Sequence, residues 1–284
     1  MDAEIVVNTD IKQKDSRHAL VIAIEHCAFF DQNGDWEPKS SNTASEVLSH
    51  GPAISFIKAI QRVNHKLMEK NPNETFLFDV ILICNNQIPE NQSKIVTSAK
   101  HYGLEISRFC FCNDASFTNS MLSNNVKLFL STNRDDIVKT QERGLPAALL
   151  CKQVAQEAVD QLKFLFIGDS LGIPEDLKGE MFNVNQPHSL QITQASLKEL
   201  VAVIGQMRSK FGQDDSPLRT CLVTLWSPRD VCVRALKTFR DWGMEVEEAY
   251  CLAGTPPSAI LAQIQPHVLC GDGLYHMRDV AALS

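Results

Sequence analysis

The sequence predicts an α/β fold in which parallel sheets are flanked by helices and the chain consists of two internally similar halves. Two observations support this prediction. Short apolar runs of strand length alternate with longer segments of helical periodicity, and the second half repeats the order of the first. Alternating strands and helices with short connections form parallel sheets that helices cover on both faces. The expected domains span residues 18–150 and 151–284.

The first half contains four segments typical of buried strands, at 19–24, 78–84, 104–111 and 127–132. Between the first two, residues 52–68 carry apolar side chains at helical spacing, and Pro52 suits the first turn. A second helix is expected at 92–102, where Gly103 ends it. The polar segment 31–50 is the best candidate for a mobile surface loop.

The second half contains four further strand-like segments, at 163–169, 219–225, 244–252 and 267–272. Residues 196–211 predict an amphipathic helix, and Ser196 and Glu199 have the spacing of a capping box at its start. Residues 229–242 predict a second helix, which Gly243 ends. The order of these elements matches the order in the first half.

A shift of 140 residues places the two halves over one another. The shift aligns Gly103-Leu-Glu-Ile with Gly243-Met-Glu-Val, Cys84 with Thr224, and 127–132 with 267–272. The rival interpretation is that any α/β chain overlays on itself. The shared Gly-x-Glu pattern and the stretch that aligns without gaps favour a duplication of one Rossmann-like unit.

Composition and net charge argue against several classes of protein. Apolar residues make up 44% of the 284 residues and charged residues 21%, so a buried core is expected. The formal net charge of −7 does not suit a protein that binds a nucleic-acid polymer. Neither a membrane helix nor a secretory signal is expected. The nine cysteines include no CxxC pair, which is typical of reduced thiols in a cytoplasmic protein.

Polar side chains follow the strands of the second half, at the edge where parallel sheets bind ligands. Asp169 and Asp272 stand at the ends of the first and fourth segments, and Thr224 lies near the end of the second. Acids and a hydroxyl in this order suit phosphoryl transfer on Mg²⁺. Trp226 and Ser227 are candidate substrate-binding residues, although Trp226 could equally cover the core.

Several longer stretches carry a resemblance to a known family. They are GPAISFIKAIQRVNHKL (51–67), FDVILICNN (78–86), HYGLEISRFC (101–110), PLRTCLVT (217–224), RALKTFRDWGMEVEEAYCLAGTP (234–256) and QPHVLCGDGLYH (265–276). From about residue 18 to 277 the chain resembles the haloacid-dehalogenase superfamily, and more closely the cytosolic 5′-nucleotidases of type I. The resemblance implies a haloacid-dehalogenase-like fold, nucleoside monophosphates such as AMP as substrates, Mg²⁺ as cofactor and self-association.

The resemblance implies roles for three retained residues. Asp169 matches the general acid/base of the first motif, Thr224 matches the hydroxyl of the second, and Asp272 matches one of the paired metal-binding acids of the fourth. Each of these residues also has a purely structural interpretation. Asp169 and Asp272 also suit turns, and Thr224 also suits a strand as a β-branched residue.

Three positions depart from the family pattern. Ile167 stands where the nucleophilic aspartate is expected, Pro257 where the lysine is expected, and Gly271 where the other paired acid is expected. An isoleucine has no lone pair with which to attack phosphorus or bind Mg²⁺. In the first half, Glu25 and His26 occupy the position of the first motif and are interpreted as scaffold.

We therefore expect a catalytically impaired pseudoenzyme of nucleotide metabolism, with a binding or regulatory role. One alternative is an active, Mg²⁺-dependent hydrolase of nucleoside monophosphates in which Asp169 replaces the missing nucleophile. Another is a structural partner of an active relative, associating through the oligomer surface that the resemblance implies. A homo-oligomer is expected on the same ground.

Overall fold

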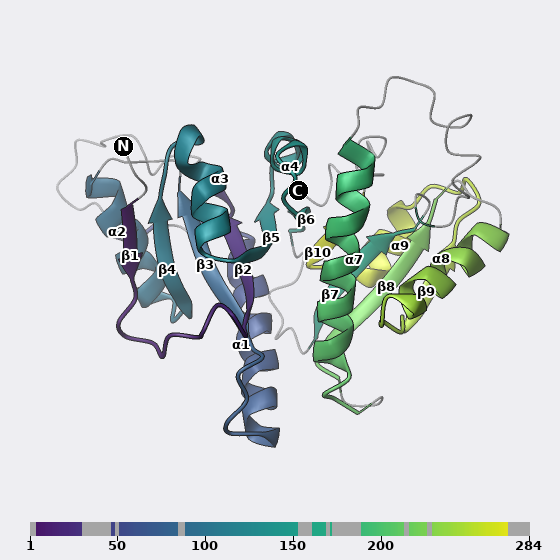
Figure 1. The fold of residues 1–284 in the computed structure, drawn as a ribbon, viewed down its shortest axis with the longest axis horizontal. Helices are drawn as coiled ribbons and strands as arrows, with labels where there is room; N and C mark the ends of the chain where they lie inside the picture. Colours follow the sequence, from purple (N-terminus) through teal and green to yellow (C-terminus); the bar gives the residue numbers. More distant parts are fainter. Residues whose placement is uncertain are drawn as a thin grey trace. The chain divides into compact units, whose positions relative to one another are not determined.

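A computed structural model describes the chain at residues 4–29, 47–48, 51–84, 89–152, 161–168, 171, 189–212, 216–225 and 229–271. The chain divides into two compact units, Met1–Thr132 and Asn133–Ser284, each with strands side by side and helices packed against them (Figure 1). The α/β fold class with mainly parallel strands is confirmed. Apart from Val47 and Leu48, the expected loop at 31–50 lies outside the described residues.

The first unit is a five-stranded sheet with the order β1-β4-β3-β2-β5. Its strands are β1 (Glu4–Val7), β2 (Leu20–Glu25), β3 (Phe78–Cys84), β4 (Ile106–Phe111) and β5 (Val126–Ser131). Strands β2 to β5 are parallel to their neighbours, and β1 pairs antiparallel with β4 at the edge. The connections are η1 (His26–Ala28), α1 (Ala53–Lys70), α2 (Pro89–His101) and α3 (Asp114–Ser123).

The second unit begins with α4 (Arg134–Glu142) and β6 (Ala147–Leu150). Its remaining elements are β7 (Leu162–Ile167), α7 (Ser189–Arg208), β8 (Leu218–Thr224), α8 (Arg229–Asp241), β9 (Glu248–Cys251), α9 (Ser258–Ile264) and β10 (Val268–Cys270). The strand order is β6-β10-β7-β8-β9, in which β7 to β10 are parallel and β6 pairs antiparallel with β10.

The two units repeat one topology. In each, the first parallel strand pairs with the second on one side and with the fourth on the other, and the third lies beyond the second. The helix ends repeat as well, because Gly103 and Gly243 both take positive φ, at 65° and 90°. Leu104 and Met244 then donate their backbone N–H groups to the fifth residue back, Ala99 and Phe239, in the same C-terminal cap. The internal similarity expected from the 140-residue shift is present in the fold.

The core lies along the central strands, whose residues are buried on both sheet faces. All seven residues of β3 are buried, including Asp79, which is 0% exposed. Arg108 on the neighbouring β4 donates to the Asp79 carboxylate at 2.6 Å, so the charge is paired inside the sheet. Burial of the apolar side chains on these strands is the main stabilising contribution.

Two expected element boundaries differ from the structure by four residues or more. The helix expected from 196 begins at Ser189, so Ser196 lies inside α7 and not at a capping box. No Gly or Pro stands between these positions to stop the helix from extending toward its start. The strand expected from 244 begins at Glu248, because Met244 is used in the cap that ends the preceding helix. None of the helices that the structure describes has the length and apolarity required to cross a membrane.

Candidate functional site

Three of the expected site positions meet at the carboxyl ends of neighbouring strands in the second unit. β7 ends at Ile167, β8 ends at Thr224, and Gly271 directly follows β10. Because β7 lies between β8 and β10 and all three are parallel, these residues share one edge of the sheet. The other expected residues lie outside the part of the chain that the structure describes: Asp169, Trp226, Ser227 and Asp272.

Ile167 and Gly271 are in direct contact at this edge. Ile167 is 2% exposed, so a branched hydrocarbon fills the expected nucleophile position. A β-carbon on Gly271 would lie 2.7 Å from the Ile167 β-carbon, and the φ of Gly271 is 145°. Side chains rarely adopt that φ, and β-carbons do not approach so closely. Position 271 therefore has no room for the acid that the family pattern places there.

Thr224 is the one retained motif position that the structure describes, and it is 0% exposed. Its Oγ1 has no hydrogen-bond partner among the described residues. Its methyl group faces Gly168, since a β-carbon on Gly168 would lie 3.4 Å from Thr224 Cγ2. A buried hydroxyl without a partner is unfavourable unless something else bonds to it, such as a ligand. Thr224 therefore lies beside the residue that precedes Asp169, with its hydrogen-bonding capacity unused by the described residues.

Pro257 occupies the expected lysine position and forms the N-cap of α9. Its φ of −76° suits the start of a helix, and its side chain makes no capping hydrogen bond. A proline carries neither a charge nor a donor, so it cannot hold a phosphoryl oxygen as a lysine does. At this position the residue favours the start of α9.

The described motif positions do not fit Mg²⁺. That ion requires oxygen ligands in a near-octahedral arrangement. Ile167 and Gly271 supply no side-chain oxygen, and Thr224 supplies one neutral hydroxyl. The described part of this edge therefore has neither the nucleophile nor the ligand set for covalent phosphoryl transfer on a metal.

The equivalent edge of the first unit is polar. The register that places Ile24 beside Leu130 brings Glu25, the last residue of β2, next to Ser131, the last residue of β5. Ser131 Oγ donates to Glu25 Oε2 at 2.6 Å. By topology, Glu25 and Ser131 correspond to Ile167 and Gly271 in the second unit. The same two positions thus hold a hydrogen-bonded pair in one unit and an apolar contact in the other.

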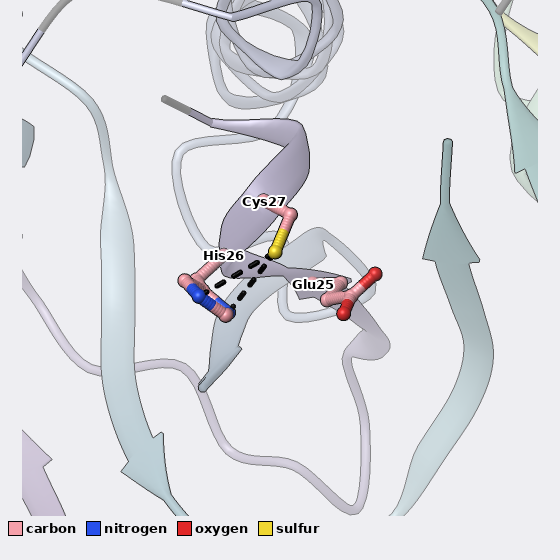
Figure 2. A group of neighbouring side chains, drawn as sticks. All are labelled: Glu25, His26 and Cys27. Atoms are coloured by element: carbon pink, nitrogen blue, oxygen red, sulfur yellow. Dashed lines mark hydrogen bonds between the residues drawn. The ribbon is translucent and has the colours of Figure 1, made fainter. Parts of the chain in front are cut away.

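Glu25 begins a cluster of three consecutive side chains with metal-ligand chemistry (Figure 2). One ligand atom from each of Glu25, His26 and Cys27 lies within 4.8 Å of the other two. The expectation that Glu25 and His26 are scaffold rested on the absence of the motif's acid pair from this half of the sequence. A run of three ligand-type residues directly after an apolar strand is the sequence signal that points to this cluster.

Burial controls the protonation of His26 and of several cysteines elsewhere in the chain. Burial lowers the pKa of His26 to about 4, so its imidazole is neutral at pH 7. Burial raises the pKa of the Cys110 and Cys151 thiols to about 12, and that of Cys270 further. Such thiols stay protonated and unreactive at physiological pH. None of the nine cysteines, all of which lie in the described part of the chain, forms a disulfide bond; seven are buried, Cys27 is half-buried and Cys251 is exposed.

Comparison with known proteins identifies the family. The family model for 5′-nucleotidase matches residues 12–283. Human cytosolic 5′-nucleotidase 1B is 28% identical to this chain over an alignment of 297 residues, which covers 94% of this chain and 48% of that protein. The chain therefore spans about half the length of this curated relative. With nearly its whole length matched by the family model, this chain belongs to the 5′-nucleotidase family.

Proposed function

We propose that this chain is a catalytically impaired 5′-nucleotidase-like protein of the cytoplasm that binds nucleoside monophosphates and serves a binding or regulatory role. The contact between Ile167 and Gly271 carries the proposal. It fills the expected nucleophile position with hydrocarbon and leaves no space for one of the paired acids. Loss of a nucleophile commonly lowers turnover by several orders of magnitude, because the groups of such a site act together.

Retained binding is supported by Thr224. Its buried Oγ1 lacks a partner among the described residues, and an oxygen of a bound phosphate would supply one. Hydrogen bonds to charged oxygens are stronger than those between neutral groups. Members of the family act on nucleoside 5′-monophosphates, so such a molecule is the ligand we expect at this edge.

The proposal is tested by measuring turnover and binding on the same preparation. The full chain is incubated with AMP, IMP or dCMP and Mg²⁺, and phosphate release is recorded together with the melting temperature. We expect no release above background and a higher melting temperature with nucleotide. Turnover that Asp169→Asn abolishes would instead establish the active-enzyme alternative.

A matched pair of variants locates the binding. Thr224→Val preserves the shape of a buried strand residue and removes the hydroxyl, so it should fold and lose most of the nucleotide-induced melting shift. Thr220→Val removes a hydroxyl from the same strand but away from its carboxyl end, where Thr220 Oγ1 donates to Glu247. This variant should keep the nucleotide-induced melting shift. No turnover and no shift with any nucleotide would refute binding and favour the structural-partner alternative.

A further inference from the structure

The end of β2 lies at the point in the first unit where the strand order reverses. β2 pairs with β3 on one side and with β5 on the other, so the chain leaves β2 between two oppositely directed crossovers. In doubly wound α/β folds, ligands bind at such switch points, beyond the carboxyl ends of the strands. Glu25, His26 and Cys27 are the residues at this point.

A change of backbone conformation brings the three side chains together. In a continuous strand, consecutive side chains point to opposite faces. Here β2 ends at Glu25, with φ −69° and ψ 140°, and His26 begins the 3₁₀ turn η1. Figure 2 shows the Cys27 sulfur between the His26 ring and the Glu25 carboxylate. The donor set of sulfur, imidazole nitrogen and carboxylate oxygen therefore converges on one small volume.

The distance between the two closest donor atoms matches a tetrahedral metal centre. Cys27 Sγ lies 3.5 Å from His26 Nε2 and 3.7 Å from His26 Nδ1. Zinc bonds of about 2.3 Å to sulfur and about 2.0 Å to nitrogen, at a tetrahedral angle, separate the two donors by about 3.5 Å, which is the distance between Sγ and Nε2. The other ring nitrogen would then lie about 5 Å from the sulfur, so metal binding requires the His26 ring to turn. The carboxylate oxygen lies within 4.8 Å of both donors, and a tetrahedral set would place it about 3.5 Å from them, so the gap to be closed is no more than about 1.3 Å.

The surroundings hold these donors in place. Ser131 donates to Glu25 Oε2, which orients the carboxylate in the way that outer hydrogen bonds orient metal ligands. The η1 turn packs against Gly51, where a β-carbon would lie 2.6 Å from the Ala28 carbonyl oxygen. The Gly51 N–H also donates to the Phe29 carbonyl. His26 is 8% exposed, while Glu25 and Cys27 are half-buried and so reachable from solvent.

We propose that Glu25, His26 and Cys27 form a binding site for a divalent transition metal of the zinc type. A thiolate and an imidazole favour Zn²⁺ or Co²⁺ over the hard cation Mg²⁺, which takes oxygen ligands. Three protein ligands leave a fourth position for water or a small anion. The site lies in the first unit, so the outcome of its test does not depend on whether a nucleotide binds to the second unit.

Cobalt is the probe that tests this site, because a thiolate bound to Co²⁺ gives a charge-transfer band. The full chain is stripped with chelator and titrated with Co²⁺. We expect one ion per chain with a thiolate band, at least tenfold weaker affinity in Cys27→Ser, and an unchanged titration in Cys251→Ser, which removes the exposed thiol. No band in the unmodified protein, or a band that survives Cys27→Ser, would overturn the proposal.

Stability measurements supply a second readout and a check on folding. Zn²⁺ should raise the melting temperature of the unmodified protein and not of folded Glu25→Gln or Cys27→Ser. Ser131→Ala leaves all three donors in place but removes the orienting hydrogen bond, so it should weaken Zn²⁺ affinity about tenfold. An equal Zn²⁺ shift in all of these variants would show binding elsewhere and refute the site.

Discussion

Ile167 and Gly271 lie side by side at the ends of β7 and β10, and the β-carbon of Ile167 occupies the space that a side chain at 271 would need. The topologically equivalent pair, Glu25 and Ser131, is joined by a hydrogen bond. The two units therefore share a fold and differ in the chemistry at one pair of positions. At this pair of positions the polar side chains are those of the first unit, whereas the family pattern places acids at the pair in the second unit.

Gly271→Ala should destabilise the fold. The added carbon would meet Ile167 at 2.7 Å and would require the unfavourable φ of 145°, so we expect a loss of about 2–3 kcal/mol in the free energy of unfolding. Urea denaturation measures the loss. Gly212→Ala is the control, because a β-carbon there meets nothing within 4 Å, and it should change stability by less than about 0.5 kcal/mol. Equal stability of the two variants would contradict the contact.

The buried pair of Asp79 and Arg108 should show strong coupling. Asp79→Leu leaves the Arg108 charge, whose side chain is 17% exposed, without its carboxylate, so we expect a loss of about 3–5 kcal/mol. Adding Arg108→Met should restore at least about 2 kcal/mol, because both charges are then gone.

A double-mutant cycle by urea denaturation checks this coupling. The exposed pair of Asp230 and Arg234, one turn apart on α8, serves as the comparison, and its coupling should stay below about 0.5 kcal/mol. Additive losses at Asp79 and Arg108 would show that the two charges do not depend on each other.

Acid should destabilise the second unit through His267. The Lys163 N–H donates to His267 Nδ1 at 3.2 Å, and burial, aided by the Lys163 charge, lowers the pKa of His267 to about 4. Between pH 6.5 and about 4, the unfolded chain binds a proton here that the folded chain does not. This histidine then lowers the free energy of unfolding by up to about 1.4 kcal/mol per pH unit as pH falls.

His267→Asn tests the assignment, since its side-chain oxygen can accept the same hydrogen bond. The variant should show a flatter fall in stability between pH 6.5 and 4 in urea melts. His65→Asn, at an exposed position on α1, is the control for the loss of a histidine. A slope that both variants share with the unmodified protein would rule out His267 as its source.

Thiol labelling should separate the cysteines by burial. Cys27 and Cys251, half-buried and exposed, should react first with a disulfide reagent at pH 8. Cys112 and Cys221 should react only as the protein opens, because burial raises their thiol pKa values to about 11 and about 12. Mass spectrometry of the labelled peptides reads the order, and all nine should react in urea. Labelling of Cys221 as fast as Cys251 in the native protein would contradict its burial.

The sequence was most informative where burial alone decides structure. The central strands, such as β3 and β7, are mostly apolar because helices cover both faces of a parallel sheet. β1 was not predicted, since it is a four-residue edge strand with exposed Ile5 and Val7 in a polar segment. α3 was not predicted either, because hydrogen bonds between Asn113 and Ser116 fix its start and its apolar periodicity is weak.

The sequence predicted where the candidate-site residues lie in the fold better than it predicted which of them are in contact. The motif pattern placed Ile167, Thr224 and Gly271 at strand ends, where the structure has them. The exclusion of any side chain at 271 depends on a backbone torsion and on the register between β7 and β10, which residue types do not encode directly. The convergence of Glu25, His26 and Cys27 likewise depends on the strand ending in a 3₁₀ turn.

The most direct test of the central claim is an attempt to trap a phosphorylated enzyme. The unmodified chain is incubated with Mg²⁺ and with AMP that carries a radioactive phosphorus, and the reaction is quenched in acid. Covalently bound label is then sought by intact-protein mass spectrometry and autoradiography. Because Ile167 offers no oxygen to attack phosphorus, we predict no label on the protein, with human cytosolic 5′-nucleotidase 1B assayed in parallel. A phosphorylated side chain on the unmodified chain would contradict the account.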